Sequence, residues 1–471
     1  MKRFRFLWVW MLLVLKVHAQ KEVLYSVPDL KQDLGVFRAA LQEAHPGLYV
    51  YHAKAYYDAR FEAIERELKR PMSEEAFYKL LNPLVAGIGC GHTKWHRDGR
   101  PDDLLAFHKT GLFPLKLVFI NRKAYVKYAY GDSEIPLGSE VKKINGVSIT
   151  DISTSLLKEV IADGRVESSR WRMLGDRFAG YYVSFMGERR QFTIKFKEPE
   201  GAVRVARVNA VDVAALDTHQ EEKAGETVRL SFMADSIAVL RIPVFMPSEN
   251  SPSFEDVLPE VFRRIDSARA HHLVIDLRDN EGGLDRWGVL LYAWLTGKPF
   301  NYYDRLTVVS DQPFSFRQYA TLPDEYDQLK NFIKKQGNEY VFTMHPNLGE
   351  QSPQAHPYAG KLYVLINGLS FSVSAEFAAI VRDRHRGIFI GEESGGTIAG
   401  NNSGGFAIVK LPHTHLTLGV PLLRYHMRLN GNYPDGTGVV PEYIPVPGVG
   451  DVLGKKDVVM ERTLELIQGR K

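Results

Sequence analysis

Apolar residues recur at helical spacing in two segments near the start of the chain: Leu30, Leu34, Phe37 and Leu41, then Tyr57, Phe61, Ile64 and Leu68. This spacing predicts two amphipathic helices, the first of which ends at Pro46-Gly47. Ser73, followed by two glutamates, predicts the start of a third helix, and we expect Pro83 to interrupt it. The pattern therefore predicts a helical N-terminal domain over residues 20–100, which closes in the glycine-rich loop 87–93.

The pattern changes to strand-like alternation after residue 105. Residues 113–117 and 124–126 alternate, and residues 135–147 read as a strand that ends in Asn145-Gly146, ahead of a helical piece at 152–161. This order resembles a PDZ module, a class of domain that binds peptide ends by strand addition. We expect a PDZ-like domain over residues 105–200, with 166–190 as an insertion. An unrelated small β domain is the alternative.

Short apolar runs alternate with helical patterns from residue 225 to the C-terminus. The expected strands are 237–245, 273–277, 362–366 and 388–390, and the expected helices are 254–268, 287–295 and 374–385. Such alternation predicts parallel crossover units, so the fold class is α/β and multidomain. We expect the aromatic and polar residues 301–360, with a helix at 323–335, to be an inserted cap on this core.

Composition adds an expectation about export. The 471-residue chain begins with a basic stretch, an apolar run over residues 6–15 and small residues before Gln20, the order of a signal peptide cleaved after Ala19. Ten apolar residues are too few to span a bilayer, so we expect a periplasmic or secreted protein without stable membrane insertion. Loss of residues 1–19 would remove four of the 60 basic residues and none of the 56 acidic ones. That balance argues against a nucleic-acid partner.

Two segments of the core have the residue types that acyl transfer needs. Ser372 lies in a strand–turn–helix unit, where free N–H groups and the helix dipole favour an oxyanion. Gly282-Gly283 opens another helix, so its N–H groups can face an anion as well. The alternative is structural, because Ser372 or Ser374 would be an ordinary helix cap.

Four segments occur in an order that resembles a family of serine peptidases. They are Gly91-His92-Thr93, residues 275–283, residues 371–379 and residues 436–442. The chain resembles the family that includes the tail-specific, C-terminal-processing proteases and the tricorn core peptidases. The resemblance implies a core similar to Clp protease and crotonase, built of parallel ββα units over residues 225–471. It also implies that Ser372 is the nucleophile.

The resemblance also separates two branches of the family. The tail-specific branch uses a lysine base, and Thr397 falls where that lysine would be. The tricorn-like branch brings a histidine from the N-terminal side, which His92 matches as general base and acid. By the same likeness Asp435 would orient His92, although that branch has a glutamate there. Gly91 replaces the serine that usually precedes the histidine.

The predicted function is an exported serine-type peptidase that hydrolyses peptide bonds through a Ser-His acyl-enzyme. The oxyanion would be bound by the N–H of Val373 and that of Gly282 or Gly283. The partners expected are peptide or protein substrates, with no cofactor and no metal, and the oligomeric state is left open. A catalytically silent ligand- or peptide-binding protein on the same fold is the alternative.

Overall fold

The computed structural model describes residues 23–97, 100–101, 104–217, 228–233, 236–247 and 252–470. The expected signal peptide, residues 1–19, lies outside this part.

The described chain begins with three helices, α1 (Val27–Ala44), α2 (Lys54–Glu67) and α3 (Glu74–Gly87). Ser26 and Ser73 cap α1 and α3 by accepting a backbone N–H three residues on. The expectation for Pro83 was wrong, because α3 continues through it. A proline removes only one hydrogen bond, and the apolar face of α3 is buried on both sides of Pro83.

A six-stranded antiparallel sheet follows. Its strands are β3 (Leu115–Ile120), β4 (Lys123–Ala129), β5 (Glu140–Ile144), β6 (Val147–Ser148), β7 (Gln191–Lys197) and β8 (Val203–Asn209). Helices α4 (Ile149–Leu156), α5 (Glu167–Asp176) and α6 (Phe178–Met186) accompany the sheet, and α7 (Val213–Asp217) leaves it. In β7, Phe192, Ile194 and Phe196 are buried while their neighbours are exposed, which is the period-two pattern of a sheet with one buried face.

A five-stranded sheet forms the centre of the C-terminal half. Its order is β19 (Ile388–Gly391), β18 (Lys361–Ile366), β11 (His272–Asp276), β10 (Ile237–Arg241) and β9 (Arg229–Met233), and all pairings except β9–β10 are parallel. Helices α8 (Phe254–Ser267), α9 (Asp285–Ala293) and α11 (Val373–Asp383) are the connections between the parallel strands. Successive residues of β18 belong to different hydrophobic clusters, and α13 (Val458–Ile467) packs against the smaller cluster. Helices therefore cover both faces, as a mixed α/β fold requires.

An eight-stranded sheet joins segments that are far apart in sequence. The long hairpin of β20 (Asn402–Lys410) and β21 (Thr417–Met427) pairs with β14 (Ala320–Thr321) on one side and β13 (Tyr303–Val308) on the other. The remaining strands of this sheet are β16 (Glu339–Phe342), β15 (Ile333–Gln336), β1 (Lys94–Arg97) and β2 (Arg100–Pro101). β1 pairs antiparallel with β21, which ties the N-terminal region to the C-terminal half.

The segment expected as a separate cap is thus part of this sheet. Residues 301–360 supply β13 to β16, and β12 (Phe300–Asn301) pairs with β17 (Glu350–Gln351). The helix expected at 323–335 is only a short α10 (Tyr326–Leu329) and a 3₁₀ turn (Lys330–Phe332) before β15 begins. Pairing of β15 with β16 prevails over the local helical pattern.

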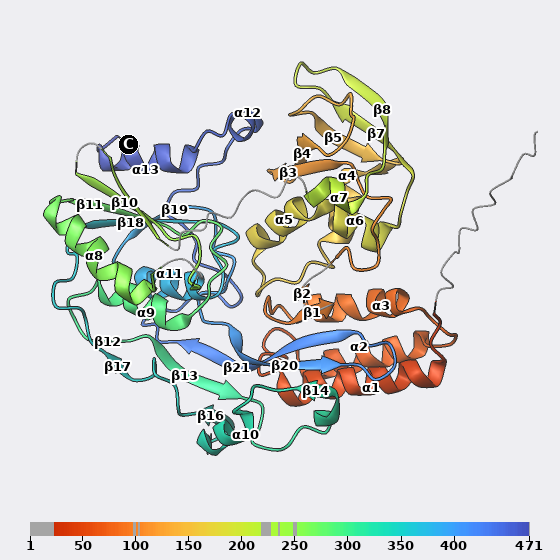
Figure 1. Ribbon diagram of the computed structural model, residues 1–471, viewed down its shortest axis with the longest axis horizontal. Helices are drawn as coiled ribbons and strands as arrows, with labels where there is room; N and C mark the ends of the chain where they lie inside the picture. The colour runs from red at the N-terminus through yellow and green to blue at the C-terminus, as the bar shows by residue number, and fades with distance from the viewer. Residues whose placement is uncertain are drawn as a thin grey trace, which may run out of the picture.

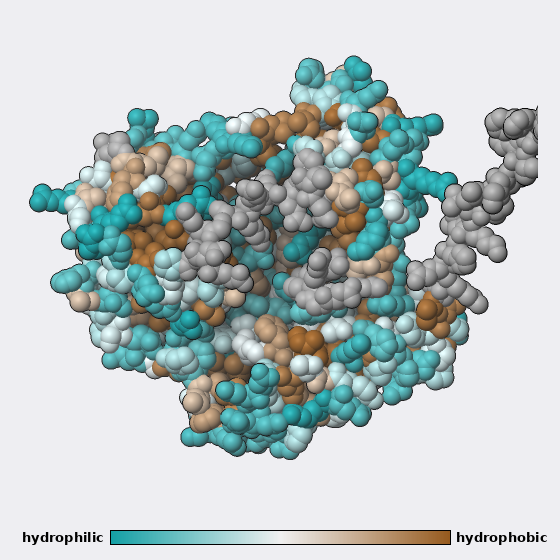
Figure 2. Space-filling model, in the orientation of Figure 1, coloured by the Kyte–Doolittle hydropathy of each residue, from teal (hydrophilic) through white to brown (hydrophobic). Residues whose placement is uncertain are grey.

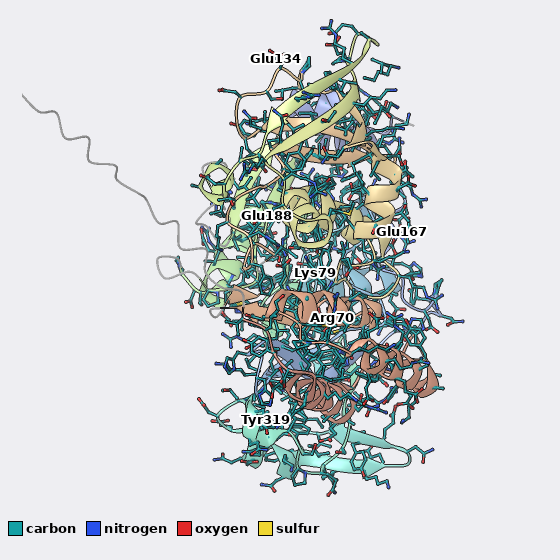
Figure 3. All side chains as sticks on the ribbon, turned by 90° about the vertical axis from the view of Figure 1, so that its right-hand side faces the viewer. Arg70, Lys79, Glu134, Glu167, Glu188 and Tyr319 are labelled. Atoms are coloured by element: carbon teal, nitrogen blue, oxygen red, sulfur yellow. The ribbon has the colours of Figure 1, made fainter. Side chains whose placement is uncertain are left out.

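The three parts surround the middle of the molecule. Figure 1 shows the five-stranded sheet with α8 at the left, the six-stranded sheet at the upper right and α1–α3 beside the β20–β21 hairpin below. The turned view of Figure 3 separates the layers: Glu134, Glu167 and Glu188 lie above Lys79 and Arg70, and Tyr319 lies at the bottom. Figure 2 shows a largely hydrophilic face with scattered hydrophobic patches. Among the described residues, no helix has the length and apolar character needed to cross a membrane.

Asp33 generates a stability prediction. This buried carboxylate of α1 accepts the N–H groups of His413 and Thr414, at 3.0 and 2.8 Å, and the Thr414 hydroxyl at 2.6 Å, in the turn between β20 and β21. Asp33→Ala should lower the free energy of unfolding by about 2–3 kcal/mol, because buried donors lose a charged acceptor. Urea unfolding followed by circular dichroism measures this.

The matched comparison is Lys31→Ala, also on α1. Its ion pair with Glu65 is about half exposed on both sides, so the loss should stay below about 1 kcal/mol. Equal losses in the two variants would contradict the role given to Asp33.

Candidate active site

Ser372 occupies a sharp turn between β18 and α11. It is the residue before the first turn of α11, with φ 54° and ψ −125°, a conformation that costs a non-glycine residue free energy. The turn is held by Ser370, whose hydroxyl donates to Leu277 O at 2.8 Å and accepts Asn367 N–H at 3.0 Å. The strained serine is therefore fixed by its neighbours and projects beside the first N–H groups of a helix, as in nucleophile elbows.

His92 meets Ser372 from the other end of the chain. Its Nε2 lies 3.1 Å from Ser372 Oγ, across 280 residues of sequence. The ring of Phe371 lies 4.5 Å from the imidazole, centroid to centroid, and restricts its orientation. The structure thus brings the predicted nucleophile and the predicted base within hydrogen-bond distance, the arrangement required for proton transfer.

The loop that carries His92 is anchored on both sides. Thr93 is fully buried, and its Oγ1 lies 2.8 Å from His45 Nε2. Directly after it, β1 pairs with β21 from Lys94 onward. His45 remains neutral in this position, since burial lowers its pKa to about 3. The anchoring keeps His92 in place.

The electrostatic surroundings keep His92 neutral. Burial is the main cause that lowers its pKa, to about 3, and the positive charge of Lys94 lowers the pKa further. A neutral imidazole can accept a proton, whereas an imidazolium cannot. His92 is therefore in the protonation state of a base throughout the neutral pH range.

The loop after β11 forms the opposite wall. A Cβ built on Gly282 would lie 2.6 Å from Ser372 Cβ and 2.9 Å from Val373 N, so only glycine permits this approach. The N–H of Gly282 donates to Asn280 Oδ1 at 2.9 Å and is thus already used. Of the two alternatives, Gly283 fits better as the second oxyanion donor. Val373 N–H belongs to the first turn of α11, where helices leave N–H groups unpaired.

Thr397, where the resemblance placed the lysine of the tail-specific branch, is a buried threonine. Thr397 is 6% exposed, and its hydroxyl donates to the carbonyl of Gly400. A threonine cannot replace an amine as base. His92 is the group that faces Ser372 instead.

Asp435 does not take the orienting position expected for it. It is exposed, and His92 Nδ1 has no hydrogen-bond partner among the described residues. The backbone next to Asp435 contacts the segment after Asp163 instead: Gly436 O accepts Arg165 N–H at 2.7 Å, and Gly164 packs against Gly436. The side chain one residue earlier is left at the surface.

Asp163 is a carboxylate that the sequence analysis missed. It is 2% exposed, and its Oδ1 accepts the N–H of Gly91 at 2.6 Å, next to His92. Burial raises its pKa to about 7. No spacing links Asp163 to the other motifs, so no sequence signal marked it.

Cys90 completes a small cluster with Asp163 and His92. One potential donor atom from each of the three residues lies within 4.8 Å of the others. Burial raises the pKa of the Cys90 thiol to about 12, and metal binding requires a thiolate. His92 Nε2 is already engaged by Ser372. We therefore assign no metal ligands to this cluster.

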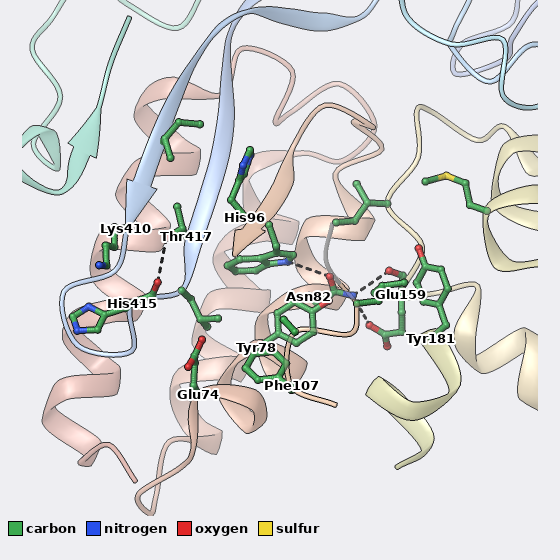
Figure 4. A pocket seen from close by; sticks show the side chains of 17 residues that line it. Glu74, Tyr78, Asn82, His96, Phe107, Glu159, Tyr181, Lys410, His415 and Thr417 are labelled. Atoms are coloured by element: carbon green, nitrogen blue, oxygen red, sulfur yellow. Dashed lines mark hydrogen bonds between the residues drawn. The ribbon is translucent and has the colours of Figure 1, made fainter. Parts of the chain in front are cut away.

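A separate pocket of about 480 Å³ lies beyond β1. Figure 4 shows Tyr78, Phe107 and Tyr181 around it, with Asn82 bonded to Glu159 and to the indole of Trp95. Neither Ser372 nor His92 lines this pocket. It adjoins the strand that follows the histidine loop and is not the place where the two side chains meet.

The fold and the Ser372–His92 pair define the class of an α/β protein with the site of a serine hydrolase. Residues 236–444 match the model of Peptidase family S41. The tail-specific protease of Haemophilus influenzae (strain ATCC 51907 / DSM 11121 / KW20 / Rd) is 25% identical over 238 residues, which is 49% of this chain but only 28% of that protein. The resemblance drawn from the four motifs is confirmed, and residues 236–444 are similar to the S41 peptidases.

Solved structures agree on the fold. Mature CPAF is 16% identical, with a TM-score of 0.66 over 93% of this chain and 96% of that chain. The complex of mature CPAF with lactacystin gives the same TM-score over 94% of this chain and 99% of that chain. The likeness in fold thus extends well beyond residues 236–444.

Gly282 supplies a prediction about this site. Gly282→Ala should slow hydrolysis of an activated ester, such as p-nitrophenyl acetate, by about 10²-fold, since the new methyl group must displace Ser372 or the Val373 N–H. Gly297→Ala is the control, because a Cβ there meets nothing within 4 Å. Equal rates for Gly282→Ala and the native chain would contradict the close approach.

Proposed function

We propose that this chain is a serine-type peptidase in which Ser372 and His92 hydrolyse peptide bonds through an acyl-enzyme. The observation that carries the proposal is the 3.1 Å contact between His92 Nε2 and the hydroxyl of a strained serine at the start of α11. Family resemblance supports the peptidase reading over that of a silent binding protein, which has no need of a neutral base at this place.

In the proposed reaction, Ser372 Oγ attacks the carbonyl carbon of the scissile bond while His92 Nε2 takes its proton. The resulting oxyanion accepts hydrogen bonds from the N–H of Val373 and from that of Gly283. When the C–N bond breaks, His92 gives the proton to the leaving amine. Water, deprotonated by His92 in turn, then attacks the ester carbonyl and releases Ser372.

The parts outside the core receive supporting roles in this proposal. The six-stranded sheet, whose last strand β8 lies beyond the expected bounds 105–200, is proposed as a PDZ-like module that presents peptide ends, with α5 and α6 as its insertion. The crossover units of 225–471 are proposed as a Clp protease- and crotonase-like core, and α1–α3 as the domain that supports the base. Strand addition at a sheet edge is the mode by which such a module would hold substrate.

The mechanism predicts which serine matters. Ser372→Ala and His92→Ala should each lower kcat for peptide cleavage by on the order of 10⁴–10⁶. Ser374→Ala should retain most activity, because Ser374 is buried within α11 and its hydroxyl has no hydrogen-bond partner among the described residues. Cleavage of a mixed peptide library, read by mass spectrometry, measures all three.

Circular dichroism would show that the variants are folded. If Ser374→Ala is inactive while Ser372→Ala is active, the nucleophile has been misassigned. If both variants cleave peptides at the native rate, the peptidase proposal is contradicted.

The proposal includes export of the protein, because its N-terminal sequence has the order of a signal peptide. The native protein, isolated from its source, should begin at Gln20, because signal peptidases cut after small residues such as Ala19. N-terminal mass analysis measures this, and an intact Met1 would contradict it.

A further inference from the structure

The tautomer of His92 poses a problem that the Ser-His pair alone does not solve. To accept the proton of Ser372, neutral His92 must keep Nε2 free and bear its own proton on Nδ1. That Nδ1 is buried and has no hydrogen-bond partner among the described residues. Burial without a partner disfavours this tautomer and disfavours the imidazolium still more.

Asp163 has a buried carboxylate oxygen that lacks a hydrogen-bond donor within the ranges that the structure describes. Its Oδ1 is satisfied by Gly91 N–H, but its Oδ2 is buried and has no partner in the described part of the chain. A carboxylate oxygen of Asp163, a ring nitrogen of His92 and Cys90 Sγ lie within 4.8 Å of one another. A buried donor and a buried acceptor, each unsatisfied, thus belong to two side chains that meet in the same small space.

The backbone holds Asp163 in this position from three sides. Gly164 N–H donates to Gly89 O at 2.9 Å, and Arg165 N–H donates to Gly436 O. Gly164 has φ +52°, and a Cβ there would lie 2.4 Å from Gly436 O and 2.6 Å from Thr397 Cγ2. The carboxyl group therefore has little room to withdraw from the histidine loop.

We propose that Asp163 is the positioning residue of His92: it accepts the Nδ1 proton, fixes the tautomer and stabilises the imidazolium formed when Ser372 attacks. The inference deepens the proposed function and rests on it. Gly91 fits this role, because it lets its own N–H reach Asp163 while its Cα lies against Phe371. Small movements of the ring or the carboxyl group would close the Nδ1–Oδ2 hydrogen bond, which commonly shortens in substrate complexes.

The groups around Asp163 set a pH dependence. Burial raises its pKa to about 7, while Gly91 N–H, Thr397 N–H, Lys94 and Arg170 act to lower it. Cys90 and Tyr51 also face it, and its charge contributes to raising the pKa of both. Because the raised pKa belongs to an acid, Asp163 is ionised above about pH 7 and neutral below. Only the ionised form stabilises an imidazolium, so activity should decline as the pH falls through this range.

The test is the pH profile of kcat/KM for peptide cleavage between pH 5.5 and 8.5, measured in EDTA on the full-length mature chain. Asp163→Asn should lose about 10²–10⁴-fold at pH 8 and should lose the decline below pH 7. Asp163→Glu should restore part of the rate, and its pH profile should again show a decline where the carboxyl group becomes protonated. A merely structural residue would give neither the altered profile nor the rescue.

Asp33→Asn is the matched control, a buried aspartate that also accepts backbone N–H groups but lies on α1. It should keep the native pH profile. Native rate and profile in Asp163→Asn, or a loss in Asp435→Asn alone, would overturn the inference. Since Ser372→Ala would still be inactive in that case, the failure would be distinct from a failure of the peptidase proposal.

Discussion

The contact between Ser372 and His92 is the constraint on which the rest of the structure depends. It joins α11 of the core to a loop that ends the N-terminal helices, and it spans 280 residues of sequence. Pairing of β1 with β21, and the bonds from Asp33 to the turn of the same hairpin, hold the two parts in register. The segment that matches the peptidase family, 236–444, contains Ser372 but not His92. The helical region is therefore a structural part of the site and not an accessory.

A second constraint is the burial and the exclusion of side-chain volume around the serine. Gly282 leaves room for Ser372 and Val373, and Asn280 accepts the Gly282 N–H. Burial keeps both His92 and His45 neutral, with the pKa of each near 3. A cation formed during catalysis would be poorly solvated in such surroundings, and the nearby buried carboxylate of Asp163 is the group best placed to offset that cost.

Much of the fold could be predicted from the local pattern of apolar and polar residues, whereas the candidate site could be predicted only in part. The helices near the N-terminus and the parallel strands with their connecting helices were predicted, because apolar spacing reports which face is buried. The segment 323–335 was mistaken for a helix, since nothing local reveals that residues 333–336 pair with 339–342. Ser372 and His92 were singled out by motif, but their contact needed the fold. Asp163 was missed because burial, not residue type, makes that carboxylate significant. Asp435 was chosen because the resemblance placed an acidic residue there, but its side chain is exposed to solvent.

The most direct test of the central claim is to map the adduct formed with a fluorophosphonate, a reagent that captures only activated serines. The account predicts a single phosphonate on Ser372, identified by mass spectrometry of proteolytic fragments, and almost none in His92→Ala, because the hydroxyl then lacks its base. An adduct on another serine, or equal labelling of Ser372 after removal of His92, would contradict the account.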